Sequence, residues 1–242
     1  AVTALCVASF AIVLSLTGLF QGMEWDVLDQ FFRLRPLESP DPRITIVTVG
    51  ETDITKIGQW PIPDRVLVEA IKNIKARNPR AIGLDLYRDL PVEPGHEALV
   101  EMFKSTPNLI GIEKVVGSRV APPLVLSQLG QIGFIDIVLD LDGKVRRGLL
   151  SVKRQQRVYL SLSLQMALIY LKAEGVNPNQ IGDNRLQFGK ATFQPFKPND
   201  GGYVGADDGG YQILLNFRGL LDNFPTISLT DLLNNQIAPG LI

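Results

Sequence analysis

Acidic side chains follow three of the segments that the sequence predicts as strands. Glu51 and Asp53 come after the first strand, Asp85 after the second and Glu113 after the third. In an open parallel sheet, ligands bind beyond the carboxyl ends of the strands, and Mg²⁺ and Ca²⁺ prefer carboxylate oxygens. The same residues could instead cap turns or pair with nearby arginines, namely Arg65, Arg88 and Arg119. The structural role is the simpler interpretation, so no metal ligand is assigned.

A second acidic motif, Asp140-Leu141-Asp142-Gly143, follows an apolar segment. It resembles the nucleophile loop of haloacid-dehalogenase-type phosphatases, in which a Thr or Val, a later Lys and a second acidic pair are also needed. Lys144 stands where the Thr is usual, although Asp207-Asp208 could provide the acidic pair. An Asp-Gly turn between the apolar runs 132–138 and 145–152 predicts a plain hairpin. We favour the hairpin and keep a Mg-dependent phosphohydrolase as the alternative.

Arginines offer a further kind of chemistry. Arg146-Arg147 and Arg218 could each hold an anionic ligand by paired hydrogen bonds, or could lie on the surface as ordinary charges. His96 is the only histidine and is expected on the surface near a helix start, and Cys6 is the only cysteine. A disulfide within the chain, a Cys-based zinc site and a multi-histidine metal site are therefore excluded. No cofactor is expected.

The overall charge limits the partners. The 242 residues include 24 basic and 25 acidic side chains, so the net charge is −1. This balance gives no general attraction to nucleic acid, and we expect no nucleic-acid partner. The length is enough for one large domain with a core that needs no disulfides.

Residues 43–86 are predicted to form the strand–helix–strand unit that positions the first of these acidic residues. Residues 44–49 are rich in β-branched side chains and favour a strand, and residues 81–84 favour a second. Between them apolar residues recur at helical spacing from Asp64, which can cap the helix, to a stop at Asn78 before Pro79. A crossover of this length makes the two strands parallel.

Later segments extend this pattern. A helix at 96–105 and a strand at 109–112 complete a βαβαβ run, and the chain continues with a helix at 158–172 and antiparallel strands at 186–188 and 192–196. A strand at 211–217 and a helix at 228–234, capped by Ser228, follow. The predicted fold class is α/β, with a mixed sheet, a parallel βαβαβ core, helices on both faces and an N-terminal transmembrane helix.

The start of the chain is apolar. Residues 1–23 carry no charge, and about 20 apolar residues span the ~30 Å hydrocarbon layer of a bilayer as a helix. We favour a transmembrane helix over the hydrophobic region of a signal peptide. The missing initiator Met suggests that the chain is truncated at its N-terminus. Residues 24–42 are predicted as a juxtamembrane helix and linker. The helix is amphipathic and could dock on the domain, with Asp29 on its polar side, and Trp25 suits a headgroup anchor. Residues 43–242 then form the main domain.

Several local motifs occur together in one order. They are residues 29–35 (Asp-Gln-Phe-Phe-Arg-Leu-Arg), 46–51, 57–65 with Gly-Gln-Trp-Pro, 81–86, 133–136 with 140–147, and 214–219. This order resembles the type-2 CHASE domain, the extracellular sensory module of bacterial cyclases, histidine kinases and serine/threonine kinases. Two positions depart from the family pattern: Ile62 stands where a second aromatic is frequent and Asp64 where an Arg is frequent, for which Arg65 could substitute.

The resemblance implies a sensory role. The domain is expected to be extracytoplasmic, non-enzymatic and membrane-anchored, and to pass a conformational change through the juxtamembrane helix to a cytoplasmic cyclase or kinase domain beyond this chain. Its partners would be a small-molecule or protein ligand, the membrane and a second copy of the chain as a homodimer; a plain interaction or dimerisation domain is the other alternative. We expect the ligand to bind at the strand-end face around Trp60, Arg65 and Asp85, with Arg147 and Arg218 as further candidates.

Overall fold

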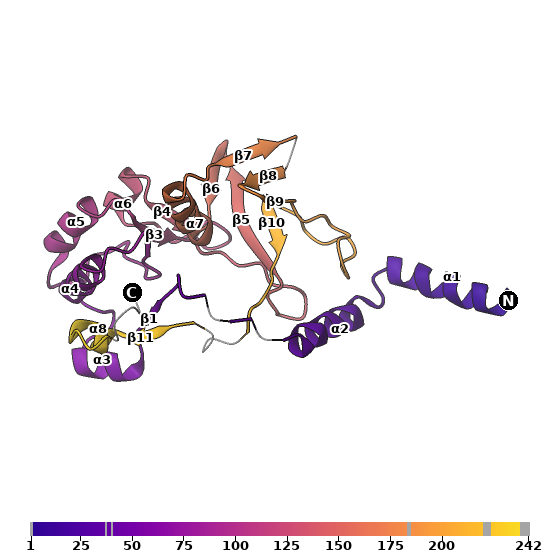
Figure 1. The fold of residues 1–242 in the computed structure, drawn as a ribbon, viewed down its shortest axis with the longest axis horizontal. Coiled ribbons are helices and arrows are strands. Elements are labelled where there is room, and N and C mark those ends of the chain that lie inside the picture. The colour runs from indigo at the N-terminus through magenta and orange to yellow at the C-terminus, as the bar shows by residue number, and fades with distance from the viewer. Residues whose placement is uncertain (1, 37, 40, 183–184, 220–223, 238–242) are drawn as a thin grey trace. The chain divides into compact units, whose positions relative to one another are not determined.

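The computed structural model describes residues 2–36, 38–39, 41–182, 185–219 and 224–237 (Figure 1). The chain forms two compact units. The first contains Ala1–Leu37, Ile137–Val158 and Asn179–Phe217, and the second contains Glu38–Asp136, Tyr159–Pro178 and Arg218–Ile242. Each unit is therefore built from three separate stretches of sequence.

The second unit contains a parallel sheet with strand order β2-β3-β4. Ile82 pairs with Leu109, and Gly111 pairs with Ile132. Helices connect the successive strands, so this is a βαβαβ run: β2 (Ile82–Gly83), α5 (His96–Lys104), β3 (Leu109–Glu113), α6 (Leu124–Gln128) and β4 (Ile132–Phe134). A parallel βαβαβ element is present, but it begins one strand later than the sequence predicts.

The predicted pairing of the first two strands is wrong. Strand β1 (Ile46–Thr48) pairs in parallel with β11 (Thr226–Ser228), in a sheet separate from that of β2. Two helices follow β1, α3 (Glu51–Ile57) and α4 (Asp64–Lys75). A run of β-branched residues indicates a strand but not its partner, because backbone hydrogen bonds can form with any other strand. Here the partner strand lies about 180 residues later in the sequence.

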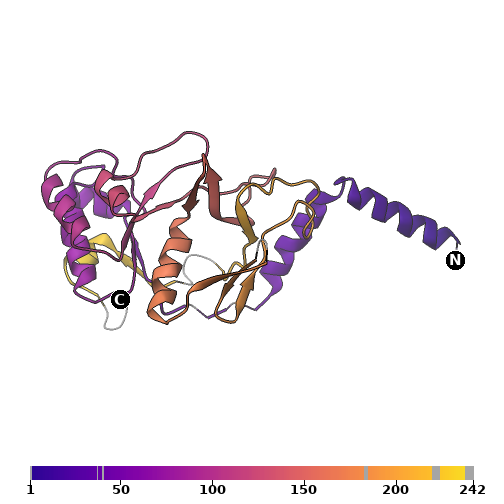
Figure 2. The ribbon, with the colours of Figure 1, turned by 90° about the horizontal axis from the view of Figure 1, so that it is seen from above.

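Helices cover both faces of the β2-β3-β4 sheet, as predicted. Helix α7 (Leu162–Ala173) packs against all three strands. A Cβ at Gly133 would lie 2.5 Å from the backbone of Leu162, whereas one at Gly111 would meet the Leu126 side chain of α6. Helices α4 and α5 lie side by side in both views (Figures 1 and 2), and α8 (Leu229–Leu233) packs on α4.

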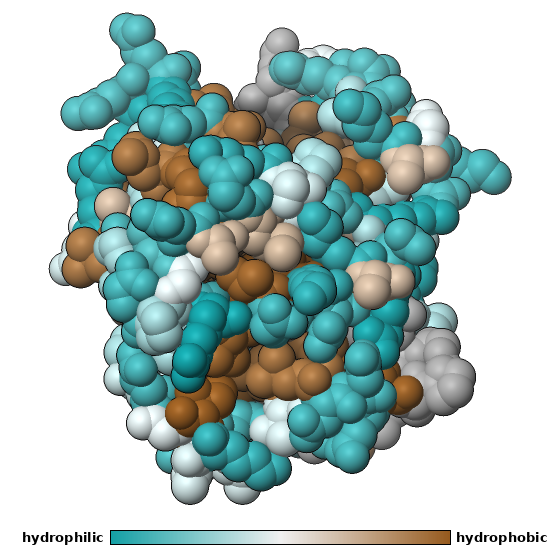
Figure 3. All heavy atoms as spheres, turned by 90° about the vertical axis from the view of Figure 1, so that its left-hand side faces the viewer, coloured by the Kyte–Doolittle hydropathy of each residue, from teal (hydrophilic) through white to brown (hydrophobic). Residues whose placement is uncertain are grey.

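The hydrophobic core of the second unit lies between these helices and strands. Its buried side chains come from α4, α5, α6, α8 and the strands β2, β3, β4 and β11, and include Leu67, Leu99, Leu109, Leu126 and Leu232. On the side that carries α3, α4 and α5, hydrophilic residues cover most of the surface and hydrophobic atoms show in the gaps between them (Figure 3). This is the pattern of amphipathic helices that turn their apolar faces inward.

Two predicted helix caps have different outcomes. Ser228 caps α8 as predicted, because its Oγ accepts a hydrogen bond from the Asp231 backbone N–H. Asp64 does not cap α4: Pro63 holds the N-cap position, and Asp64 is the first helical residue, with a fully buried carboxylate. A buried carboxylate needs partners, and those of Asp64 are tertiary.

The first unit begins with two helices, α1 (Val2–Leu16) and α2 (Gln21–Leu34). Two small sheets follow, with strand orders β10-β5-β6 and β7-β8-β9. The bounds of these strands are β5 (Arg147–Arg154), β6 (Arg157–Leu160), β7 (Pro178–Ile181), β8 (Arg185–Phe188), β9 (Ala191–Phe193) and β10 (Tyr211–Leu214). The antiparallel pairing of β8 with β9 is as predicted, whereas the predicted helix at 158–172 begins only at Leu162 because β6 occupies the residues before it.

A small aromatic core holds the first unit. Trp25 of α2 is 4% exposed and packs with Phe196 and Tyr203, with ring centroids 5.2 Å apart for Trp25 and Tyr203. The prediction that Trp25 lies at the headgroup level as an anchor is therefore wrong. Its spacing alone could not distinguish the face that docks on the protein from a face that meets lipid.

The predicted Asp-Gly hairpin is only partly present. The turn exists, since the Asp140 N–H donates to the Lys144 carbonyl and Gly143 adopts a left-handed φ of 76°. Its flanks, however, are joined by a single antiparallel bridge between Val138 and Arg147. The longer predicted strands separate after this bridge, because β4 pairs with β3 and β5 pairs with β10.

The apolar start of the chain is divided into two helices. Within the described residues, neither helix is by itself long and apolar enough to cross a bilayer; α1 and α2 together would meet that requirement, but they are bent by 89° at the break between them. The transmembrane helix over residues 1–23 stays a prediction, as does the division of the chain at residues 23 and 42.

Gly133 gives a test of the packing of α7 on the sheet. We expect Gly133→Ala to force the start of α7 away from β4, since the added methyl would lie 2.5 Å from the Leu162 backbone. Overpacking of this kind costs about 1–3 kcal/mol, measurable as the free energy of urea unfolding. Gly22→Ala is the control, because nothing lies within 4 Å of a Cβ at that helical position. Equal stability of the two variants would contradict the packing.

Candidate functional site

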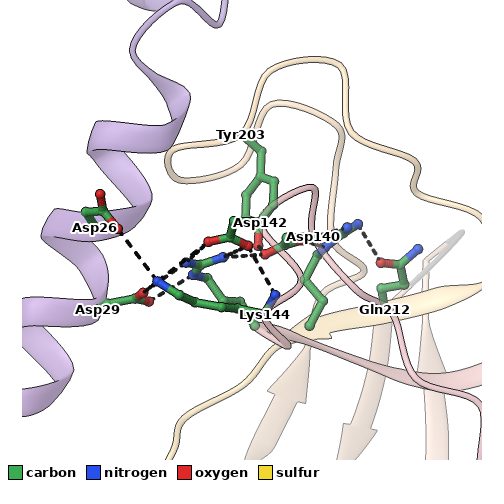
Figure 4. A network of polar contacts seen from close by, with 9 residues as sticks. Asp26, Asp29, Asp140, Asp142, Lys144, Tyr203 and Gln212 are labelled. Atoms are coloured by element: carbon green, nitrogen blue, oxygen red, sulfur yellow. Dashed lines mark hydrogen bonds and ion pairs between the residues drawn. The ribbon is translucent and has the colours of Figure 1, made fainter.

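One arginine in the first unit joins helix α2 to the Asp140–Gly143 turn. Arg146 is 5% exposed, and its guanidinium group donates to three carboxylates (Figure 4). Nε and Nη2 each lie 2.9 Å from Asp29 of α2, Nη2 lies 2.7 Å from Asp142, and Nη1 lies 2.9 Å from Asp140 and 3.0 Å from Asp142. A guanidinium has five N–H donors, and all five are used. We call Arg146 with Asp29, Asp140 and Asp142 the Arg146 clamp.

Asp140 links the clamp to a second arginine. Its side chain is fully buried, and one carboxylate oxygen accepts from Arg146 Nη1 and from the Tyr203 hydroxyl at 2.7 Å. The other accepts from Nε and Nη2 of Arg147, whose Nη1 donates to the side chain of Gln212 at 3.0 Å. Both oxygens of Asp140 are thus occupied, which compensates for the cost of burying its charge.

Aromatic rings support the two guanidinium groups. Arg146 lies over the ring of Trp25 at 5.1 Å, and Arg147 lies over the rings of Phe196 and Tyr203, both at 5.0 Å. Contacts of this kind attract the cation to the ring face and fix the plane of the guanidinium. The aromatic core and the polar clamp are therefore one assembly, and both reach α2.

The charges of the clamp shift several pKa values. Hydrogen bonds from Arg146 lower the pKa of Asp29, and they lower the pKa of Asp142 from 3.8 to about 2. The hydrogen bond of Lys144 to Asp29, 2.6 Å long, raises the pKa of that lysine. Burial, with the hydrogen bond to Asp140, raises the pKa of the Tyr203 hydroxyl. All of these groups therefore keep their ordinary charge near neutral pH.

A half-open cavity of about 310 Å³ lies beside the clamp. Asp29 and Arg146 line it, together with mostly apolar side chains: Leu28, Phe32, Val145, Leu214, Leu215 and Phe217, with Arg33 and Lys144. Its volume is at the lower end of the range for small-molecule sites. A ligand in this cavity would touch both sides of the clamp.

The five residues expected to bind ligand are divided between the units. Arg147 lies in the first unit, and its guanidinium is held by Asp140. Arg218 lies in the second unit, where it pairs with Glu38 and Asp41. Trp60, Arg65 and Asp85 also lie in the second unit, and all three are exposed. The exposed fraction of Trp60 is 56%.

Among the residues that the structure describes, no hydrogen bond or ion pair joins these three exposed residues to one another. Trp60 precedes α4, Arg65 lies in its first turn, and Asp85 follows β2. Strands β1 and β2 belong to different sheets, so the shared strand-end face that suggested this site is not formed by one sheet. A ligand site at these residues stays a prediction.

Comparison with known protein families shows to which family the chain belongs. The CHASE2 domain family matches residues 2–242. The chain belongs to the CHASE2 family. Members of this family are sensory domains of signalling receptors. Comparison with curated proteins and with solved structures gave no match.

Asp53, one of the acidic residues that follow the predicted strands, has a structural role in this CHASE2 domain. Asp53 accepts hydrogen bonds from the Gly50 N–H and from Thr230, so it caps α3 and fastens α8. Glu113 is buried in β3, whereas Glu51 and Asp85 are exposed. Among the described residues, no three Asp, Glu, His or Cys side chains are grouped so that they could hold a metal ion.

A second buried polar centre lies in the second unit of the domain. Asp64 Oδ2 lies 2.9 Å from Nδ1 of His96, and Oδ1 lies 3.3 Å from Nε of Arg88. Neither Oδ1 nor Nε forms a hydrogen bond within the described chain, so this ion pair is poorly aligned. Burial lowers the pKa of Arg88. His96 is indeed at a helix start, as predicted, but its ring is engaged by Asp64.

Sequence reasoning missed the central residue pair, Asp29 with Arg146. The two residues are 117 positions apart, and helical spacing predicts only that Asp29 lies on the polar side of its helix. One observation could have pointed to them: α2 carries three acidic residues, and three basic residues, Lys144, Arg146 and Arg147, follow the turn. Opposite charges concentrated in two elements favour an ion-pair contact between them.

Arg146→Lys tests the need for the guanidinium fork. A lysine keeps the charge but cannot donate to three carboxylates in the same geometry. We expect a loss of about 3 kcal/mol in the unfolding free energy of the first unit, because the buried Asp140 and the partly buried Asp29 and Asp142 lose hydrogen bonds from the guanidinium. Trp25 fluorescence during urea unfolding, in a Trp60→Phe background, is the measurement.

Lys153→Ala provides the control for this variant, since Lys153 is exposed in the same unit. It should unfold at the denaturant concentration of the parent. If Arg146→Lys does the same, the clamp does not stabilise the unit.

The lowered pKa of Asp142 predicts an acid-dependent stability. Its folded pKa, about 2, lies below the ordinary 3.8, so its contribution is fully present above pH 3.8 and is lost as the pH falls through about 2. We expect Asp142→Asn to be less stable than the parent at pH 6 by urea unfolding. The difference should shrink toward zero near pH 2; a difference independent of pH would contradict the ion pair.

Proposed function

We propose that this CHASE2 domain is the extracytoplasmic ligand-sensing part of a membrane-bound bacterial signal-transduction receptor. It would relay a conformational change to a cytoplasmic cyclase or kinase domain outside this chain. The observation that supports the relay is the Arg146 clamp, in which Asp29 of α2 shares one guanidinium with Asp140 and Asp142. Helix α2 directly follows the uncharged α1, the proposed anchor.

The clamp gives the relay a physical basis. A ligand shifts a conformational equilibrium only by its difference in affinity for the two states. Asp29 and Arg146 both line the 310 Å³ cavity, so an occupant would bind differently when the clamp is closed and when it is open. Because the lining is mostly apolar, an apolar or amphipathic small molecule is the ligand that it suits best.

The phosphohydrolase alternative receives no support from the acidic turn. A nucleophilic carboxylate must reach a substrate, whereas both oxygens of Asp140 accept hydrogen bonds from Arg146, Arg147 and Tyr203, and the side chain is fully buried. Asp142 is bound by Arg146 as well. A non-enzymatic role accounts for these residues without further assumptions.

Asp29→Asn tests the relay. It removes the charge of α2 from the clamp and leaves the contacts of Arg146 with Asp140 and Asp142 in place. In the full-length receptor in membrane vesicles, we expect the basal output activity to change by about fivefold or more. Acrylamide quenching of Trp25 in a Trp60→Phe background should increase, because α2 undocks.

Asp26→Asn is the matched control, since Asp26 is on the same helix, is 74% exposed and only approaches Lys144 at 3.6 Å. It should leave the output and the Trp25 quenching unchanged. The relay through α2 is refuted if the two variants behave alike in both measurements.

A further inference from the structure

Helix α2 has a second apolar face, opposite the face that docks on the first unit. Met23, Val27, Phe31 and Leu34 are 67%, 51%, 65% and 78% exposed. Their spacing of four, four and three residues places them on one side of a helix. The docked residues Trp25, Leu28 and Phe32 lie on the other side. We call the four exposed residues the outer stripe.

The turn between α1 and α2 is a built corner. Gly18 adopts a left-handed φ of 78°, and its N–H donates to the Ser15 carbonyl. The Ser15 hydroxyl donates to Glu24 of α2, and Gln21 accepts from the backbone N–H of Val204. The Ser15–Glu24 bond joins the two helices across the break at which they are bent by 89°. A specific contact therefore spans the bend.

We propose that the outer stripe lies on the lipid bilayer surface, with α2 parallel to the membrane plane. This rests on the proposed function, in which α1 enters the membrane. If α1 is aligned with the bilayer normal, a corner of 89° places α2 in the plane of the interface. The exposed apolar surface of α1 then continues into the outer stripe, and one lipid phase covers both.

The charges of α2 indicate how it binds. Glu24, Asp26 and Asp29 against Arg33 leave the helix with an acidic excess. Attraction to anionic lipid headgroups therefore does not hold it, and burial of the apolar stripe must. We therefore expect lipid contact of the stripe to be no stronger in anionic than in neutral bilayers.

The turn beside α2 exposes further apolar side chains. Ile137, Leu139 and Leu141 are 65%, 56% and 94% exposed, and they alternate with inward residues as in an extended chain. Lys144 at the end of this turn contacts Asp26 and Asp29 of α2. Exposed apolar surface is thus present both on α2 and on the turn that contacts it.

Lipid contact has a consequence for the clamp. The outer stripe would hold α2 at the interface whether or not Asp29 is bound to Arg146. Opening of the clamp then separates α2 from the turn without releasing the helix from the membrane.

The test uses the full 242-residue chain in phosphatidylcholine nanodiscs. The native Cys6, exposed on α1, is labelled with an environment-sensitive fluorophore and reports whether α1 is in lipid. In a Cys6→Ser background, Val27→Cys or Phe31→Cys carries the label on the outer stripe, and Asp26→Cys carries it on the polar flank of the same helix. Quenching by lipids spin-labelled on the acyl chain is measured.

We expect the labels at positions 6, 27 and 31 to be quenched, and the latter two about twofold more than the label at 26. Quenching at position 6 without this excess at 27 and 31 overturns the inference and leaves the membrane anchor intact. Absence of quenching at position 6 overturns the anchor and the inference together.

A second copy of the chain is the competing occupant of the stripe. Oxidation of the unlabelled Val27→Cys variant tests for it. A disulfide-linked dimer formed in high yield, with no lipid quenching at position 27, would assign the stripe to a dimer interface. Quenching with only background crosslinking supports the bilayer.

Discussion

The first unit depends on the complete use of one guanidinium group. Arg146 is almost fully buried, and its five N–H donors are distributed over Asp29, Asp140 and Asp142. A buried ion-pair network is favourable only when every member is satisfied, since each unpaired charge carries a large desolvation cost. The contact between helix α2 and the Asp140–Gly143 turn is therefore either fully formed or lost as a whole. This all-or-none property is what a relay needs.

The two buried polar centres of the domain differ in how well they are satisfied. The Arg146 clamp has short, well-directed hydrogen bonds and aromatic rings beneath both arginines. In the second unit, Asp64 is fully buried, but its ion pair with Arg88 is poorly aligned. Its remaining partners, the Val92 N–H and His96, fix the entry to α5. The better-satisfied centre is the one that includes helix α2.

The chemistry suggested by single residues was changed by their surroundings. Asp140, Asp142 and Arg147 were recognised as candidates for catalysis or anion binding, and all three occur in one site. There Asp140 and Asp142 are neutralised by Arg146 and Arg147. The fold adds Asp29 and Tyr203 as further partners in the same site. A motif gives the donors and acceptors that a segment offers. It does not say which of them the rest of the chain will use.

Local pattern was sufficient for most helices and for the type of the strands. The periodicity of α4, the Ser228 cap of α8, the β8–β9 pair and the Asp-Gly turn depend on neighbours within a few residues, so the sequence alone determined them. The family order of motifs likewise identified a CHASE2 domain. The pairing of β1 with β11, the burial of Trp25 and the Asp29–Arg146 contact were decided only by tertiary structure. Each joins residues more than 100 positions apart, and helical or strand spacing shows which face is apolar but not what covers it.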